Sequence, residues 1–179
     1  MEVSVLEVRL PNGKVVDDFH QITLQDYVII YAETPEGTVL AERQYKQGVG
    51  RVNLTLPSGG MLEGEAPLAT AQRELLEETG YAGGTWQKIG AFVIHGNYGC
   101  GTAHVFKVKG VQLVAEPDSG DLEEMEILLK TPEELFQAVL SGEVALLGSA
   151  TAVALATNPL LTDESLNGRE IKAQRQTAD

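Results

Sequence analysis

Three glutamates on one predicted helix provide the clearest chemical signal in this sequence. Glu74, Glu77 and Glu78 occur within ATAQRELLEETG, and at about 100° per residue the two later side chains lie within roughly 60° of Glu74. Carboxylates at this spacing repel one another unless a positive charge lies among them. Oxygen-rich groups of this kind suit hard cations, so the helix is a candidate site for Mg²⁺ or Mn²⁺. Such a metal polarises phosphoryl groups and lowers the pKa of a bound water.

The helix that carries these acids is predicted to span residues 66–79. Pro67 suits its first turn, and Gly80 suits its C-terminal end. Arg73 can pair with Glu77 one turn later, but a single arginine cannot neutralise three acids. The other side of the helix carries apolar side chains that can face a core: Leu68, Ala69, Leu75 and Leu76. A solvated acidic face without any metal is the alternative interpretation.

The spacing around the acids is more specific than the acids alone. Gly59 is followed after five residues by Glu65, and after seven more residues comes the run Arg73-Glu74-Leu75-x-Glu77-Glu78-x-Gly80-Tyr81. At average residue frequencies, chance agreement at this many fixed positions is on the order of 10⁻⁸ per starting point. The segment from Gly59 to Tyr81 resembles the Nudix box in full.

The resemblance implies a fold, a metal and a reaction. The fold is of the α/β class, a Nudix α/β/α sandwich with a mixed β-sheet, and its box presents Mg²⁺, with Mn²⁺ as a possible substitute. The reaction is the attack of a metal-activated water on a diphosphate linked to a second group. Each product then carries a phosphate.

The same resemblance implies roles for single residues. The metal-ligand positions, which are also catalytic, are Glu74, Glu77 and Glu78. Arg73, also counted as catalytic, and Glu65 correspond to positions that orient those ligands. Gly59 and Gly80 correspond to positions of special backbone geometry, and Ser58 to a position that often lends its backbone carbonyl to a metal.

The flanking sequence resembles the ADP-ribose and nucleotide-sugar pyrophosphatase branch of that family over residues 3–157. Leu-Pro-x-Gly at 56–59 follows Arg-Gln-Tyr-Lys at 43–46 and an N-terminal β region. In that branch the N-terminal sheet commonly helps to form a homodimer, which places both subunits around each substrate. Two positions depart from the pattern: Thr55 occupies a position where the branch usually has Glu, and no proline occurs at 94–96.

Basic residues before the box are candidates for contacts with phosphate or ribose, with ordinary surface cations as the alternative: Arg43, Lys46 and Arg51. His95 is a further candidate for substrate binding, although most histidines are structural. It precedes the glycine-rich segment GNYGCG, which is either a loop on the substrate side or a plain hairpin turn.

A further carboxylate, outside the box, is expected from a loop that follows the sheet, because the family often supplies a catalytic or metal-binding acid there. The candidate segment is 121–126, in which Glu124 is the first choice as a catalytic residue and Glu123 the second. A solvent-facing acidic loop is the alternative.

Composition narrows the classes of protein. The chain has 179 residues, a net charge of −13, one cysteine and 43% hydrophobic residues, which suits one domain with a core. A chain this acidic repels phosphate backbones, so nucleic-acid binding is not expected. No apolar run of about 18 residues and no signal peptide are visible, which predicts a cytoplasmic protein without membrane contact.

The remaining segments predict a mixed sheet covered by helices. Residues 1–48 are read as an N-terminal β subdomain, 49–160 as the Nudix domain and 161–179 as a polar, flexible tail. Within these, strands are expected at 87–95, 102–109 and 125–129, a loop-rich connection at 51–64, and helices at 132–140 and 148–157. The N-terminal hairpins are expected to form a separate small antiparallel sheet.

Three functions remain open from the sequence. The leading one is Mg²⁺-dependent hydrolysis of a nucleoside diphosphate linked to another group, with ADP-ribose or a nucleotide sugar as the small-molecule substrate. A pyrophosphatase that removes unwanted nucleoside triphosphates is the second, although the N-terminal β region is longer than such enzymes need. A catalytically silent nucleotide sensor is the third, but such domains are expected to lose box acids that this chain retains.

Overall fold

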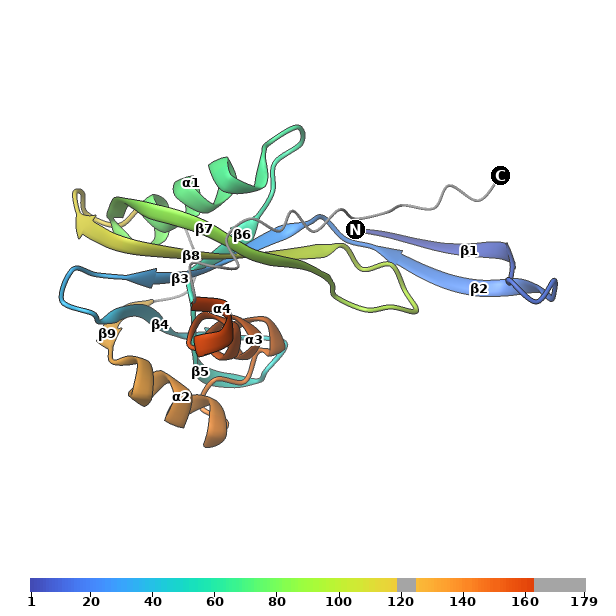
Figure 1. The fold of residues 1–179 in the computed structure, drawn as a ribbon. Helices are drawn as coiled ribbons and strands as arrows, with labels where there is room; N and C mark the ends of the chain where they lie inside the picture. Colours follow the sequence, from blue (N-terminus) through green and yellow to red (C-terminus); the bar gives the residue numbers. More distant parts are fainter. Residues whose placement is uncertain (119–124, 163–179) are drawn as a thin grey trace.

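The computed structural model describes residues 1–118 and 125–162, and Figure 1 shows how its elements are arranged. The strands in this part of the chain are β1 Glu2–Arg9, β2 Val15–Thr23, β3 Tyr27–Glu33, β4 Val39–Lys46, β5 Arg51–Thr55, β6 Ser58–Gly60, β7 Tyr81–Val93, β8 Thr102–Leu113 and β9 Glu126–Lys130. The helices are α1 Pro67–Thr79, α2 Pro132–Leu140, α3 Leu147–Ala156 and α4 Pro159–Thr162.

The large sheet is mixed, as the sequence predicts. Its strand order is β5-β4-β3-β8-β7, with β6 paired to β3 and β9 paired to β4. Strands β3 and β8 run parallel, from Tyr27 opposite Ala103 to Glu33 opposite Lys109, whereas the other pairs are antiparallel. The predicted α/β class and the small additional antiparallel sheet are therefore confirmed.

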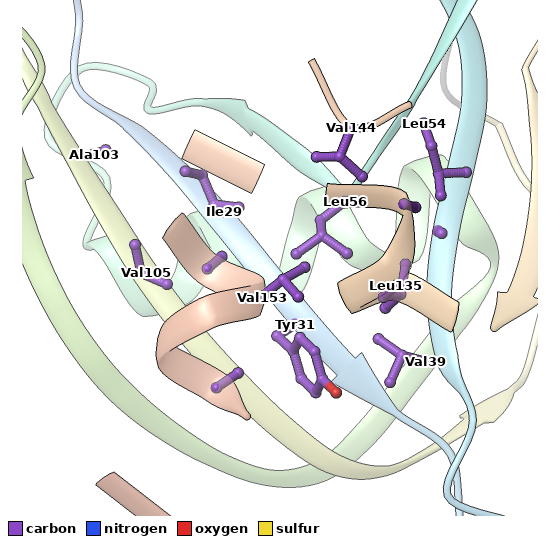
Figure 2. Packing of buried hydrophobic residues seen from close by; sticks show 14 residues of the cluster. Ile29, Tyr31, Val39, Leu54, Leu56, Ala103, Val105, Leu135, Val144 and Val153 are labelled. Atoms are coloured by element: carbon purple, nitrogen blue, oxygen red, sulfur yellow. The ribbon is translucent and has the colours of Figure 1, made fainter. Parts of the chain in front are cut away.

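Strand β3 is central because both of its faces are buried. Its side chains from Val28 to Ala32 are at most 1% exposed, which is typical of an apolar run covered on both sides. Ile29 and Tyr31 face a core beneath α2 and α3, shown in Figure 2. Val28 and Ile30 face a second core that contains Leu75 of α1. The sheet thus lies between two helical layers.

Helix α1 begins one residue later than predicted and ends at the predicted residue, but the prediction of its buried face was wrong in part. Pro67 occupies the first turn, and Gly80 ends the helix with a φ of 74°, a left-handed conformation that favours glycine. Leu75 is buried, whereas the other three predicted core residues are exposed: Leu68, Ala69 and Leu76. The buried stripe is centred on Ala71 and Leu75, so it borders the acids instead of lying opposite them.

Strands β1 and β2 form the separate small sheet (Figure 1). This sheet ends at Thr23, and β3 and β4 belong to the large sheet, so the two sheets divide before residue 27. The domain boundary at 48 stays a prediction, but the N-terminal sheet itself is shorter than residues 1–48. Its described contact with the β7–β8 hairpin includes a hydrogen bond of 2.9 Å from the Ile22 N–H to the Tyr98 carbonyl.

Several other segments differ from prediction in extent, among them β8, which ends at Leu113 instead of residue 109, and β9, which begins and ends one residue later than predicted. The connection predicted at 51–64 contains β5 and β6, and the polar side chains of Asn53 and Thr55 on β5 are buried rather than exposed in a loop. Strand β7 begins at Tyr81, since glycines there tolerate φ near +80° within the pairing. Helix α2 has the predicted bounds, and α3 begins and ends one residue earlier than predicted. Residues 163–179 of the predicted tail lie outside the described residues.

No helix in residues 1–118 and 125–162 combines the length and the apolar character that a membrane span requires.

Candidate active site

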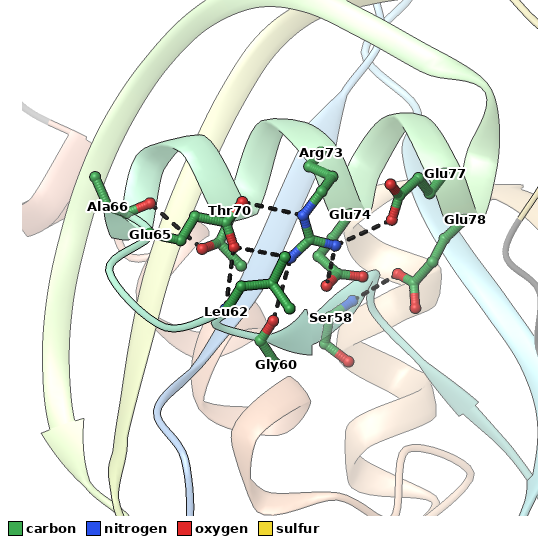
Figure 3. A network of polar contacts seen from close by, with 10 residues as sticks. All are labelled: Ser58, Gly60, Leu62, Glu65, Ala66, Thr70, Arg73, Glu74, Glu77 and Glu78. Atoms are coloured by element: carbon green, nitrogen blue, oxygen red, sulfur yellow. Dashed lines mark hydrogen bonds and ion pairs between the residues drawn. The ribbon is translucent and has the colours of Figure 1, made fainter.

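The acids of α1 lie where the helix meets the glycine strand β6 (Figure 3). The Glu74 side chain is 13% exposed and Glu78 is 8% exposed, whereas the Glu77 side chain is 46% exposed at the outer edge. Burial raises the pKa of Glu74, since a desolvated carboxylate is costly. The three acids are therefore not equivalent: two lie against the sheet and one lies at the solvent boundary.

Arg73 connects the acids of α1 to the loop that precedes the helix. Its guanidinium donates to both oxygens of Glu65 at 3.0 Å, to Glu74 at 2.7 Å and to Glu77 at 3.0 Å. It also donates to the carbonyl of Gly60 at 3.2 Å. A planar fork with five donors suits this task, and a lysine could not bridge so many acceptors. Arg73 therefore fixes two of the three box acids relative to the loop before the helix.

Strand β6 approaches the helix closely because it consists of small residues. The backbone N–H of Ser58 donates to Glu78 Oε2 at 2.9 Å. A Cβ atom placed on Gly59 would lie 2.0 Å from the Glu74 carboxyl carbon, a separation that real Cβ atoms essentially never show. Only glycine at 59 leaves the Glu74 carboxylate where it is. The metal-binding role of the Ser58 carbonyl stays a prediction.

A fourth carboxylate lies in the site, and the sequence interpretation missed it. Glu42 of β4 is fully buried. Burial of Glu78, followed by the negative charge of Glu42 nearby, raises the pKa of Glu78. The strand of Glu42 reads TVLAERQYK, a pattern in which this residue looks like one more polar position. Glu42 lies directly opposite Thr55, the position where the resembling branch usually has Glu. Only the register between β4 and β5 reveals that Glu42 lies beside position 55, because the two residues are far apart in the sequence.

The Glu65–Arg73 pair predicts an acid-sensitive contribution to stability. Its bonds to Arg73 lower the pKa of Glu65 to about 2, from an unfolded value of 4.5. The contribution is therefore complete above about pH 4.5 and is lost as the pH falls toward 2. We expect Glu65→Gln to lower the melting temperature near neutral pH, and we expect the difference from wild type to shrink below pH 4.5 and to become small only near pH 2. Glu63→Gln in the same loop is the control, and a constant difference at all pH values would contradict the assignment.

The candidate substrate cations do not gather around the acids. Arg43 pairs with Glu126 at 3.1 Å and with Glu143 at 3.5 Å, and Arg51 donates to the Gly142 carbonyl at 2.6 Å. Arg43 lies on the opposite face of β4 from Glu42, because strand side chains alternate, whereas Arg51 pairs with Lys46 and shares the face of Glu42. Contact of Arg43 or Arg51 with substrate stays a prediction. Lys46 shares the face of Glu42, four residues further along β4.

The loop that joins β7 to β8 contains His95 and the glycine-rich segment. The His95 ring packs against Tyr98 with centroids 4.5 Å apart, within a hairpin connection. Gly101 has a φ of 84°, and a Cβ there would meet the carbonyls of Leu24 and Gln25 at 2.9 Å. A hairpin turn that packs on the segment between β2 and β3 therefore explains these glycines. Contact of His95 with substrate stays a prediction.

The acid expected from 121–126 could not be placed. Glu124 and its alternative Glu123 lie outside the described residues, which resume at Met125. Their catalytic role stays a prediction.

The donor set fits a divalent cation. It consists of carboxylate oxygens, which hard cations prefer, and Gly59 provides the space that the Glu74 carboxylate occupies. Glu74, Glu77 and Glu78 would hold the ion, which would polarise a phosphoryl group and make a bound water more acidic. Within residues 1–118 and 125–162 no three His, Cys, Asp or Glu side chains converge as ligands, since Arg73 lies between Glu74 and Glu77.

A mixed sheet between helices, with an acid-bearing helix packed on a glycine strand, defines the class of Nudix pyrophosphohydrolases. The sequence profile of the NUDIX domain matches residues 23–144. The chain belongs to the NUDIX domain family. Hydrolases of this family generally use divalent metals, in agreement with the carboxylates on α1.

Named relatives support this assignment. The chain is 32% identical to an ADP-ribose pyrophosphatase of Bacillus subtilis (strain 168), over 80% of this chain and 78% of that protein. It is 29% identical to an ADP-ribose pyrophosphatase of Mycobacterium tuberculosis (strain ATCC 25618 / H37Rv), over 77% and 67%. A methanol dehydrogenase activator of Bacillus methanolicus is 28% identical over 62% and 60%. A crystal structure of an ADP compounds hydrolase shares the fold, with a TM-score of 0.73 and 14% identity over 84% and 80%.

Proposed function

We propose that this protein hydrolyses ADP-ribose, or a nucleotide sugar close to it, with Mg²⁺ as the preferred metal and Mn²⁺ as a substitute. Water attacks one phosphorus of the diphosphate and the bridging P–O bond breaks, so ADP-ribose gives AMP and ribose 5-phosphate. The observation that carries the proposal is the 32% identical relative, named an ADP-ribose pyrophosphatase, whose similarity spans 80% of this chain.

The residues of this site support distinct parts of that reaction. Glu74 and Glu78 would bind the metal from the buried side and Glu77 from the exposed side, while Arg73 holds Glu74 and Glu77 at fixed positions. The buried location of Glu74 and Glu78 limits access of bulk water, which strengthens electrostatic interactions with a bound cation. Lys46 remains a candidate for phosphate, since it shares the face of Glu42.

A substrate panel with product identification tests the proposal. The protein is incubated with ADP-ribose, other ADP- and GDP-linked sugars and nucleoside triphosphates, each with Mg²⁺, Mn²⁺ or EDTA, and products are identified by mass spectrometry. We expect AMP and ribose 5-phosphate from ADP-ribose with Mg²⁺ and none with EDTA. Faster turnover of triphosphates would select the triphosphatase alternative. Thermal stabilisation by nucleotides without turnover of any substrate would select the sensor.

Dimer formation through the N-terminal sheet is part of the proposal. A two-stranded sheet is marginally stable alone, yet Val3 and Val5 on β1 are 64% and 59% exposed. We expect the protein to elute with twice the mass of one chain in light scattering, and Val3→Glu with Val5→Glu to yield monomers of lower activity. Leu147→Glu on α3, which is 78% exposed, should remain dimeric. A monomeric, fully active wild type would refute the dimer. The predicted cytoplasmic location stays a prediction.

A further inference from the structure

Ser149 of α3 is a buried hydroxyl that contacts the chain leading into the active site. The residue is 3% exposed, and its Oγ atom accepts a hydrogen bond from the Leu56 N–H at 3.2 Å. The same Oγ atom lies 2.9 Å from Thr55 Oγ1, which donates to the Leu56 carbonyl at 3.3 Å. Because each hydroxyl has one proton, the three bonds coexist only if Ser149 donates to Thr55. Ser149 is therefore donor and acceptor at once, and both polar backbone groups of Leu56 are satisfied.

Helix α3 approaches the sheet closely where Ser149 begins to face it. A Cβ atom on Gly148 would lie 2.6 Å from Ile29 Cδ1 and 2.8 Å from the Tyr27 hydroxyl oxygen, separations that real Cβ atoms essentially never show. Glycine at 148 thus allows the first turn of α3 to pack directly on β3. Figure 2 shows Leu56 in the core next to this helix. The close packing brings the Ser149 hydroxyl within reach of the chain between β5 and β6.

The segment 55–58 connects this contact to the acids of α1. The Pro57 carbonyl accepts a hydrogen bond from β3 at 2.9 Å. The Ser58 N–H donates to Glu78 Oε2 at 2.9 Å, as Figure 3 shows. Each residue after position 55 is thus held by a different element: Leu56 by α3, Pro57 by β3 and Ser58 by α1. A shift of the chain at 56 would therefore move the donor that Glu78 uses.

We propose that Ser149 is a positioning residue of the metal site, because by fixing Leu56 it fixes the Ser58 N–H that holds the Glu78 carboxylate. Ser149 acts through the backbone of 56–58 and not by direct contact with the metal. It belongs to the core on the opposite side of β3 from α1, so the spacing of the box does not include it. The inference rests on the metal-dependent hydrolysis proposed above.

Amide hydrogen exchange in EDTA tests the inference without metal or substrate. Exchange is measured for single residues by NMR in wild type and in Ser149→Ala. The Leu56 amide should exchange faster because it loses its acceptor, and we expect the Ser58 amide to exchange roughly tenfold faster as well. The Leu75 amide of α1 should keep its rate, which would show that the fold as a whole is not loosened. A Ser58 rate equal to that of wild type would overturn the inference.

Manganese binding and kinetics test the consequence at the acids. We expect Ser149→Ala to bind Mn²⁺ roughly tenfold more weakly in a titration followed by electron paramagnetic resonance, and to lower kcat to a similar extent with little change in KM. Ser141→Ala is the matched control. It makes the same substitution at the end of α2, where the hydroxyl donates to the Ala138 carbonyl at 3.2 Å. It should bind Mn²⁺ and turn over substrate as wild type does.

The outcomes separate this inference from the proposed function. Wild-type Mn²⁺ affinity in Ser149→Ala would overturn the role of Ser149 and leave the proposed hydrolysis intact. A wild type that binds Mn²⁺ but does not hydrolyse ADP-ribose would overturn the proposed substrate, and Ser58 exchange with Mn²⁺ affinity would still decide the role of Ser149. If Ser149→Ala does not fold, Thr55→Val removes the partner hydroxyl and Thr55→Ser retains it. Mn²⁺ affinity should fall in the first variant and recover in the second, and equal affinities would refute the inference.

Discussion

Replacing Glu78 with glutamine is expected to lower kcat by about 10²- to 10⁴-fold while the fold survives. The Glu78 carboxyl group is 8% exposed and accepts a hydrogen bond from the Ser58 N–H at 2.9 Å, so its negative charge, when a bound cation favours the ionised form, is little screened by solvent. Glutamine keeps the shape but removes the charge that a cation or an attacking water requires. The measurement is AMP release from ADP-ribose under saturating substrate.

Stability should respond in the opposite direction to activity. Burial and the charge of Glu42 raise the pKa of Glu78, so its contribution to stability is complete below the unfolded value of 4.5 and is lost as the pH rises toward the raised pKa. At alkaline pH in EDTA, Glu78→Gln should therefore melt no lower than wild type, whereas Mg²⁺ should stabilise wild type more. Glu133→Gln on the exposed face of α2 is the control. Full activity in Glu78→Gln would refute the role of this residue.

Replacing Arg73 with lysine is expected to lower kcat by roughly 10- to 100-fold, because residues that orient metal ligands typically have effects of this size. Lysine keeps the positive charge but cannot bond to Glu65, Glu74 and Glu77 together. Lost hydrogen bonds to charged groups should also cost about 1–3 kcal/mol, which corresponds to several degrees in melting temperature.

Three measurements distinguish orientation from general destabilisation in Arg73→Lys. The temperature of the assay is kept well below the melting temperature, and Mn²⁺ affinity and KM are measured together with kcat. We expect weaker metal binding with little change in KM. Arg9→Lys on β1 is the control, since it makes the same substitution outside the site. If Arg73→Lys loses only stability and keeps kcat and metal affinity, its role is structural.

Local signals predicted much of the fold. Pro67 and Gly80 set the bounds of α1, and Thr131 with Glu134 forms a capping box that fixes the start of α2. The same signals missed β5, because its buried polar residues gave no apolar alternation. They also predicted the core face of α1 wrongly in part. Leu76 looks like a core residue because it is large and apolar, but packing against the sheet buries the small Ala71 and leaves Leu76 exposed.

The part of the site whose residues lie close together in the sequence was predictable. The box residues lie within one helix and the loop before it, so spacing alone placed Glu74, Glu77 and Glu78 near one another. Glu42 reaches the same place through the pairing of strands far apart in the sequence, which no spacing rule contains. The phosphate contact of Arg43 stays a prediction, whereas its salt bridges to Glu126 and Glu143 depend on tertiary contacts that the sequence does not show.

The contacts of Arg73 also bear on motion. The loop at 61–65 is mostly exposed, and such a loop normally opens independently of its neighbours. Here Glu65 bonds to Arg73 and to the Leu62 N–H, while Arg73 also holds the Gly60 carbonyl. Hydrogen-bonded amides of this loop should therefore exchange with deuterium only when the middle of α1 opens. The loop and the acid-bearing helix then form one cooperative unit of local unfolding.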